Sequence, residues 1–143
     1  MRRWAKWLVR LAFAAVFAVN VQCAVQFVLW PEGFSAAYEL SGVAGEAAVR
    51  GIGIAFLMWN VTYPAVIVDP ERFRALGWVV LVQQLVGLVG ESCLLLTLPT
   101  GHDLLASSVL RFVAFDGAGL VLMGIAWALA LATSHTEDAA SSR

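Results

Sequence analysis

Six polar side chains occur inside long apolar stretches of the sequence, where such residues are uncommon. They are Arg50, Asn60, Gln84, Glu91, Arg111 and Asp116. In a membrane, a charge near the bilayer centre costs about 2.5 kcal/mol or more, so each group must face a partner or a water-filled cavity. A carboxyl group there could act as an acid or a base, and an arginine could hold a polar head group. We predict that the six residues form a ligand-binding site, with Asp116 as the candidate catalytic residue.

The composition supports a membrane location for these stretches. Of the 143 residues, 61% are hydrophobic and 13% are charged, whereas a soluble domain carries about 25% charged residues. This hydrophobic content excludes disorder for the bulk of the chain. Nine basic residues against ten acidic ones leave no cationic surface, so we expect no nucleic-acid partner.

Four apolar segments are long enough to cross a bilayer. They cover about residues 4–30, 46–68, 73–98 and 104–133. An α-helix needs about 20 apolar residues to span the hydrocarbon layer, and each segment exceeds that length. The strands of a membrane barrel would alternate polar and apolar residues, which these segments do not. The sequence therefore predicts an all-α polytopic membrane protein, an antiparallel bundle of four transmembrane helices.

The first connection, a proline in the second span and the C-terminal residues carry further signals. In the segment 31–45, Phe34 and Tyr38 lie among small and acidic residues, which predicts a short helix on the outer membrane surface. Pro64 removes the amide that would bond the carbonyl of Asn60, so the second helix should bend there. The polar residues 134–143 are expected to form a cytoplasmic tail.

The distribution of basic residues predicts the orientation. Lys and Arg flank the first span on its N-terminal side, lie about the connection between the second and third spans, and occur at the C-terminus, but not in the first or third connection. The positive-inside rule then places both termini in the cytoplasm, and we expect a bacterial inner (plasma) membrane. An aromatic belt should consist of Trp4, Trp7, Trp78 and Trp127 at the cytoplasmic interface and Trp30 at the outer one.

Three charged residues come near one level in the outer half of the membrane. At 1.5 Å of rise per residue, Glu91 and Arg111 lie about 10 Å below the outer ends of their spans. Arg50 lies about 6 Å below the end of its own span. The third and fourth spans are joined by a short turn and must be antiparallel neighbours. We therefore predict a Glu91–Arg111 ion pair, with Arg50 nearby.

A second polar layer is expected near the midplane. Asp116 lies about 18 Å down, Asn60 and Gln84 lie about 21 Å down, and Asn20 lies about 15 Å below Trp30. These groups could line a cavity. Alternatively, together with the small residues of the spans, they could serve only to hold the helices together.

The cysteines and histidines give weaker signals. Cys23 and Cys93 both fall in the outer third of the membrane, and whether they pair stays open because no Cys-x-x-Cys motif is present. His102 and His135 are expected on opposite sides of the membrane. The sequence thus shows no spacing typical of a metal site.

Three short motifs accompany this four-span layout. They are Trp30-Pro-Glu-Gly-Phe34, Arg50-Gly-x-Gly53 and Asp69-Pro-Glu-Arg-Phe-Arg74. With them, most of the chain resembles the DoxX-like group of small four-helix membrane proteins. The resemblance implies a helix bundle and a lipophilic partner, since some members of that group are tied to quinone or thiol redox complexes. It carries over no site residue.

The sequence favours a binding or accessory protein over an enzyme. A polar cavity opening outward could hold a lipid or a quinone, or the bundle could join a larger membrane complex or a homo-oligomer. The alternative is an intramembrane enzyme that uses Asp116 or Glu91 as acid or base on a lipophilic substrate. Asp116 suits that role better, because a Glu91 paired with Arg111 would stay ionised. An oligomeric transporter is the least favoured reading, since no inverted repeat is visible.

Overall fold

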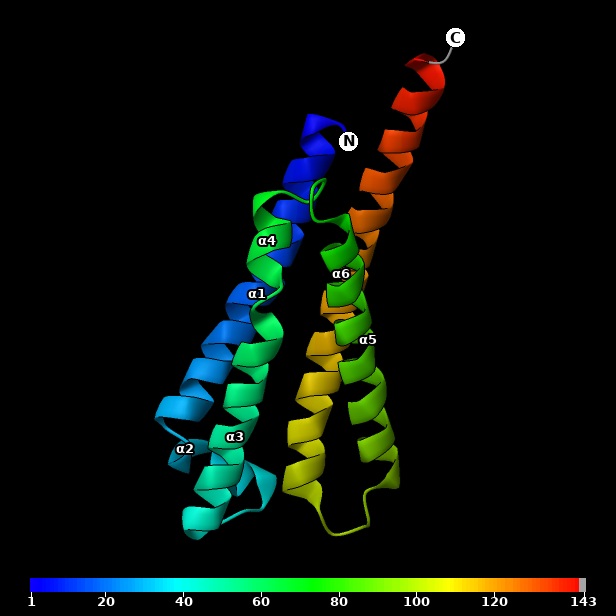
Figure 1. Cartoon of the computed structure of the whole chain (residues 1–143). Helices are drawn as coiled ribbons and strands as arrows, with labels where there is room; N and C mark the ends of the chain where they lie inside the picture. Colours follow the sequence, from blue (N-terminus) through cyan, green and yellow to red (C-terminus); the bar gives the residue numbers. More distant parts are fainter. Residues whose placement is uncertain (142–143) are drawn as a thin grey trace.

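The computed structural model describes the backbone of residues 1–141 and the side chains of residues 1–134. Its long helices are α1 (Arg3–Leu29), α3 (Gly42–Asn60) continued by α4 (Tyr63–Val68), α5 (Arg74–Thr97) and α6 (Asp103–Ser141) (Figure 1). Four helical segments are long and apolar enough to cross a membrane, and the described residues contain no strand. The predicted all-α fold with four spans is confirmed.

The helix bounds differ from the predicted ones at two ends. The second span begins at Gly42, four residues before the predicted start at Glu46. The last helix continues past the predicted end of its span, with helical backbone as far as Ser141. The tail predicted for residues 134–143 otherwise lies outside the described residues.

The interruption between α3 and α4 follows from Pro64. The helix α3 ends at Asn60, Val61 and Thr62 form a turn, and α4 begins at Tyr63. Because proline has no amide hydrogen, the carbonyl four residues earlier cannot be bonded and the helix breaks. The bend predicted at this point is confirmed, and it turns the Tyr63 side chain fully into the bundle.

The connection between α1 and α3 forms two short helical turns, α2 (Glu32–Ser35) and η1 (Ala36–Tyr38). We call residues 31–41 the cap segment. Contacts with the start of α6 hold it: the Ser108 hydroxyl donates to the carbonyl of Ala37 at 2.7 Å, and the Leu105 amide donates to Glu39 Oε1 at 3.2 Å. The short helix predicted here is confirmed.

The four long helices form two pairs, α1 with α3 and α5 with α6. The pairs converge at the end that holds both termini and the 69–73 turn, where α1 packs on α4 and α6 and α4 packs on α5 (Figure 1). We call this the terminus end and the opposite one the loop end. The apolar core lies in the terminus half, where Phe13, Tyr63, Met123 and Trp127 are buried. The loop half is therefore where cavities can open between the pairs.

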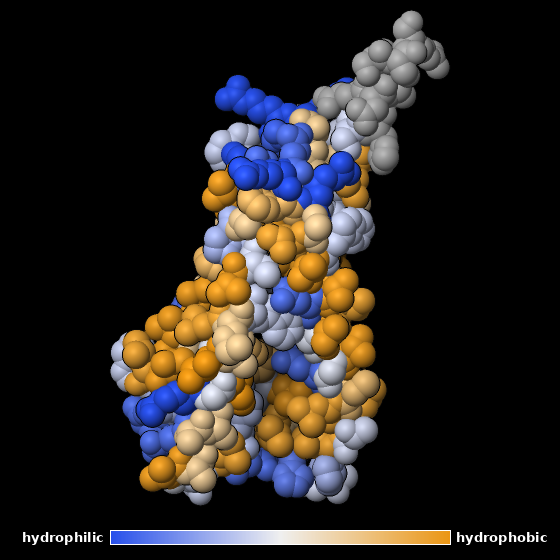
Figure 2. Space-filling model, viewed as in Figure 1, coloured by the Kyte–Doolittle hydropathy of each residue, from blue (hydrophilic) through white to orange (hydrophobic). Residues whose placement is uncertain are grey.

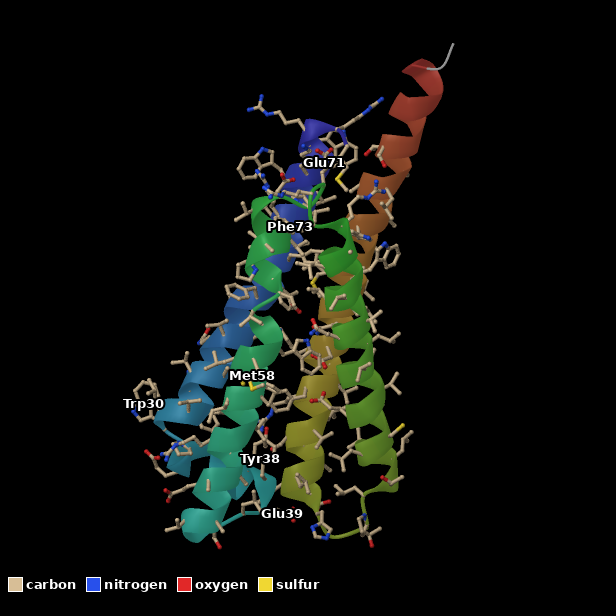
Figure 3. The ribbon with its side chains drawn as sticks, viewed as in Figure 1. Trp30, Tyr38, Glu39, Met58, Glu71 and Phe73 are labelled. Carbon is tan, nitrogen blue, oxygen red and sulfur yellow. The ribbon has the colours of Figure 1, made fainter. Side chains whose placement is uncertain are left out.

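Trp127 belongs to this core and not to an interfacial belt, so its predicted place is wrong. It is 1% exposed, and its ring lies against Gly77, where a Cβ atom would overlap it. The other four tryptophans predicted for the belt are each about half exposed, and Trp30 points away from the bundle (Figure 3). Helical rise predicted the depth of Trp127 along its helix, but not that its ring would pack into the space beside Gly77.

Polar groups tie the turn between α4 and α5 to the start of α1. Glu71 accepts the N-terminal amine at 2.7 Å and also pairs with Lys6. Asp69 Oδ1 accepts the amides of Glu71 and Arg72, both at 3.2 Å, which closes the turn. Figure 2 shows hydrophilic residues gathered at this end and apolar ones over much of the remaining face. These contacts hold the start of α1 against the turn between α4 and α5.

Candidate ligand pocket and polar chamber

A pocket of about 480 Å³ lies in the loop half, between α1, α3, α6 and the cap segment. We call it the loop-end pocket. Its walls are mainly aromatic: the ring of Phe27 lies 4.9 Å from that of Phe34, 5.9 Å from Tyr38, and 6.2 Å from both Phe56 and Phe112. These residues come from α1, both turns of the cap segment, α3 and α6. The pocket therefore exists only when all of these elements are packed together.

Arg111 is the cation of this pocket. Its Nη2 donates to Ser108 Oγ at 3.0 Å, and that hydroxyl in turn donates to the cap segment. Tyr38 lines the same pocket from the cap segment, at the loop end of the molecule (Figure 3). The buried Ser108 thus holds the guanidinium at the pocket that Tyr38 also lines, and both side chains carry hydrogen-bond donors.

The predicted Glu91–Arg111 ion pair is not formed. Among the described side chains, no carboxylate lies within 4 Å of Arg111. Glu91 lines a different cavity, described below. The two residues do lie on packed antiparallel helices. The depth of each residue in the membrane follows from helical rise. The direction of its side chain depends on how the helix is rotated about its axis, and residue spacing within one helix does not determine that rotation.

Arg50 also lies away from the other two charges, so the predicted group of three is not formed. Its side chain is exposed, and Nε donates to the carbonyl of Val28 at 3.2 Å. Val28 is in the last turn of α1, whose carbonyls have no partner within the helix. Arg50 therefore serves the end of α1 and lines neither the loop-end pocket nor the chamber next to it.

A second cavity of about 40 Å³, less open than the loop-end pocket, lies deeper in the bundle, and we call it the polar chamber. The residues that line it are Asn20, Phe56, Trp59, Asn60, Gln84, Gly87, Glu91, Phe112 and Asp116. The midplane layer predicted from residue depths is thus brought together around one space. The sequence predicts Glu91 nearer the membrane surface, beside Arg111, but it also lines this chamber.

A chain of hydrogen bonds orients the Asp116 carboxyl. The hydroxyl of Tyr63 donates to Gln84 Oε1 at 3.1 Å, and Gln84 Nε2 donates to Asp116 Oδ1 at 2.8 Å. Both Tyr63 and Gln84 are almost fully buried. The sequence interpretation missed Tyr63. Its position next to the helix-breaking Pro64 was the available signal, because the break is what turns this side chain inward.

Two oxygen atoms at the chamber have no partner among the described residues. Asn60 is 4% exposed, and its Nδ2 donates to the Phe56 carbonyl at 2.8 Å, but its Oδ1 is buried and unbonded. Glu91 Oε2 is likewise buried and unbonded. Buried polar atoms without a hydrogen-bond partner are uncommon in folded proteins, and a molecule or ion in the cavity would supply one.

Trp59 forms one wall of the chamber. The same residue lines an open apolar groove of about 530 Å³ on the outside of α5, together with Trp78, Val82 and Val86. The indole therefore separates the chamber from the face that meets the lipid chains. On the opposite side, Asn20, Phe56 and Phe112 line both the chamber and the loop-end pocket. The two cavities are thus neighbours.

The cysteines and possible metal ligands do not form a further site. Cys23 lines the loop-end pocket and Cys93 is exposed on α5, and both are free thiols. Within the described residues, no three His, Cys, Asp or Glu side chains are grouped as metal ligands.

The chain is an integral membrane protein, a four-helix bundle with an aromatic pocket and a polar chamber in its loop half. No protein-family model, curated protein or solved structure matches it. The similarity to the DoxX-like group accordingly stays a prediction.

Proposed function

We propose that this protein binds a lipophilic small molecule, a lipid or a quinone, in the loop-end pocket. The observation that carries this proposal is the pocket itself: about 480 Å³ of space with aromatic walls and one arginine that has no carboxylate partner among the described residues. Ligand sites in proteins have about 300–1,000 Å³, mostly apolar walls and a few polar groups that orient the ligand.

The polar groups of the pocket favour a ligand whose head accepts hydrogen bonds. Arg111 has several N–H donors, of which one is used by Ser108. Burial raises the pKa of Tyr38, so its hydroxyl stays protonated and can donate. A phosphate, a carboxylate or a quinone carbonyl would fit these donors.

The apolar part of the ligand would lie against the aromatic wall. Phe56, Phe112 and Phe115 all line the pocket. Burial of apolar surface contributes about 25 cal/mol per Å², so a long chain or an isoprenoid tail would supply most of the binding free energy.

Orientation is part of this proposal. Apart from Arg50 and Arg111, the described basic residues lie near the start of α1 and beside the turn between α4 and α5, and the positive-inside rule places that end in the cytoplasm of a bacterial cell. The pocket would then open toward the outer face of the inner membrane, beneath the cap segment.

Native mass spectrometry of the protein, purified from its own membranes in a mild detergent, tests the function. We expect a stoichiometric amphiphile, identified after lipid extraction, that is lost in Arg111→Ala. Arg50→Ala is the matched control, because Arg50 lies in the same half but lines neither cavity. A wild-type bundle that carries no small molecule and copurifies with larger subunits contradicts the proposal and indicates an accessory subunit of a membrane complex.

One observation favours a second function, that of an intramembrane enzyme. The chain from Tyr63 through Gln84 orients the Asp116 carboxyl at the edge of the chamber, next to the pocket. An oriented carboxyl could act as the acid or base for a lipophilic substrate, with Glu91 as the other candidate. A change in the mass of the bound amphiphile over time, absent in Asp116→Asn, would support this function.

A further inference from the structure

The polar chamber contains two carboxyl groups and no neutralising cation. Glu91 and Asp116 both line it, and no described Lys, Arg or His side chain lies within 4 Å of either one. Two ionised carboxylates without a counter-charge inside a membrane-spanning bundle are costly, because a single hydrogen bond from Gln84 to Asp116 offsets little of the lost hydration. An occupant with positive charge would offset part of that cost, since one monovalent ion neutralises one of the two carboxylates.

The buried atoms at the chamber that lack a hydrogen-bond partner among the described residues are all of one chemical kind. Both of them, Asn60 Oδ1 and Glu91 Oε2, are oxygen acceptors. Two donor groups at the chamber are engaged elsewhere, since Asn60 Nδ2 bonds the Phe56 carbonyl and Gln84 Nε2 bonds Asp116. The Phe56 carbonyl also fixes which end of the Asn60 amide faces the chamber, because only the NH₂ end can donate to it.

The size and the ligand atoms restrict the class of occupant. A volume of about 40 Å³ holds one small ion with at most a water molecule. Oxygen atoms without thiolate or imidazole select hard cations. Calcium needs about 6–8 oxygen ligands and magnesium keeps several waters, which a chamber of this size does not provide.

We propose that the polar chamber is a sodium site, formed by the carboxyl groups of Glu91 and Asp116 and the amide oxygen of Asn60. The residues come from α5, α6 and α3, so a bound ion would join the two helix pairs where they begin to diverge. This site does not depend on the amphiphile proposed above.

The route to the chamber follows from its walls. Trp59 closes it toward the lipid-facing groove of α5, whereas Asn20, Phe56 and Phe112 form its boundary with the loop-end pocket. Sodium would therefore enter from the loop end through that pocket. A ligand in the pocket would cover this route and slow the exchange of the ion.

Thermal unfolding of the purified protein tests the site. The wild type is compared in NaCl and in choline chloride of equal concentration, with direct titration of NaCl by calorimetry. We expect NaCl to raise Tm by several degrees and calorimetry to give one ion per chain. Binding to the native state alone raises stability in this way.

Glu91→Gln separates an ion site from a purely structural role. We expect sodium binding at least tenfold weaker and loss of the Tm response. In choline chloride, this variant should be at least as stable as the wild type, because the buried charge is gone. Asp116→Asn should weaken sodium binding as strongly. Glu46→Gln is the control. Glu46 lies on α3 but lines neither cavity, so this variant should keep the full response.

Three results would overturn the proposal: no difference between NaCl and choline chloride in the wild type, a response to KCl or CaCl₂ but not to NaCl, or a Glu91→Gln variant destabilised equally in both salts. The last outcome would mean that the chamber holds water and that Glu91 serves only packing. Amphiphile retention in native mass spectrometry is measured on the same variants, so a failure of the sodium site is distinguishable from a failure of the pocket.

Discussion

Gln84 on α5 donates a hydrogen bond of 2.8 Å to the carboxylate of Asp116 on α6, and it accepts one from the hydroxyl of Tyr63 on α4. One buried amide thus joins three helices at the point where the packed terminus half gives way to the cavities. The relationship also sets the direction of the Asp116 carboxyl, which borders the chamber.

Replacing Gln84 should therefore destabilise the bundle. In Gln84→Leu, the Tyr63 hydroxyl and the Asp116 carboxyl each lose a buried partner, at about 1–3 kcal/mol for each group. We expect the free energy of unfolding to fall by about 2–6 kcal/mol in a denaturant titration in mixed micelles. Tyr63→Phe leaves only one buried acceptor, Gln84 Oε1, unpaired and should cost about 1–3 kcal/mol. Gln83→Leu, at the half-buried neighbouring position, is the control. It removes one hydrogen bond, from the Thr62 hydroxyl, so an equal loss there would refute the special role of Gln84.

Gly87 allows α5 and α6 to approach at the chamber. A Cβ atom at this position would overlap Asp116 Oδ2 and lie 3.2 Å from the Trp59 ring. We expect Gly87→Ala to lower the free energy of unfolding by about 1–3 kcal/mol, as overpacking does. Gly90→Ala, one turn away on the same helix, meets nothing within 4 Å and should be neutral or slightly stabilising. Similar effects at both glycines would contradict this account of the contact.

Arg111 should set the affinity for the amphiphile. A charge-assisted hydrogen bond contributes about 1.5–3 kcal/mol, which corresponds to about 10–150-fold in Kd. We expect a loss of this size in Arg111→Ala when the extracted amphiphile is titrated back to the delipidated protein. Arg50→Ala should bind as the wild type does. Equal losses in the two variants would indicate a general effect of positive charge.

The attachment of the cap segment to α6 should depend on pH. His102 Nδ1 lies 2.5 Å from Glu39 Oε2, and the Leu105 amide bonds the other carboxylate oxygen. The His102 hydrogen bond first, and then the Leu105 amide, hold the pKa of Glu39 below its ordinary value of about 4.3. A group with a lowered pKa in the folded state stabilises it above the ordinary pKa, and this contribution is lost as pH falls through the lowered one.

Hydrogen exchange should detect this change. We expect the amides of residues 36–40 and 102–105 to exchange faster as the pH falls below about 4, after correction for the intrinsic pH dependence of exchange. Glu39→Gln should remove the pH dependence, whereas Glu32→Gln should retain it. Unchanged protection of the cap segment in acid would show that Ser108 and the Phe27 ring hold it without Glu39.

Features that depend on residues close in the chain could be predicted from the sequence. The four spans follow from the length of apolar runs, which is a property of composition alone. The break after Asn60 follows from the missing amide of Pro64, and the short helix of the cap segment follows from Phe34 and Tyr38 among small residues. Helical rise likewise predicted that Asn60, Gln84 and Asp116 share a layer.

Only the tertiary structure decided which of these residues meet. Glu91 and Arg111 have similar levels on adjacent helices, yet one faces the chamber and the other the loop-end pocket. Trp127 has the depth of a belt residue, but it packs into the space beside Gly77. The physical reason is that local sequence determines the rise of a helix, whereas its rotation about its axis is set by packing against its neighbours. The pocket, formed by five separate elements, has no local signal at all.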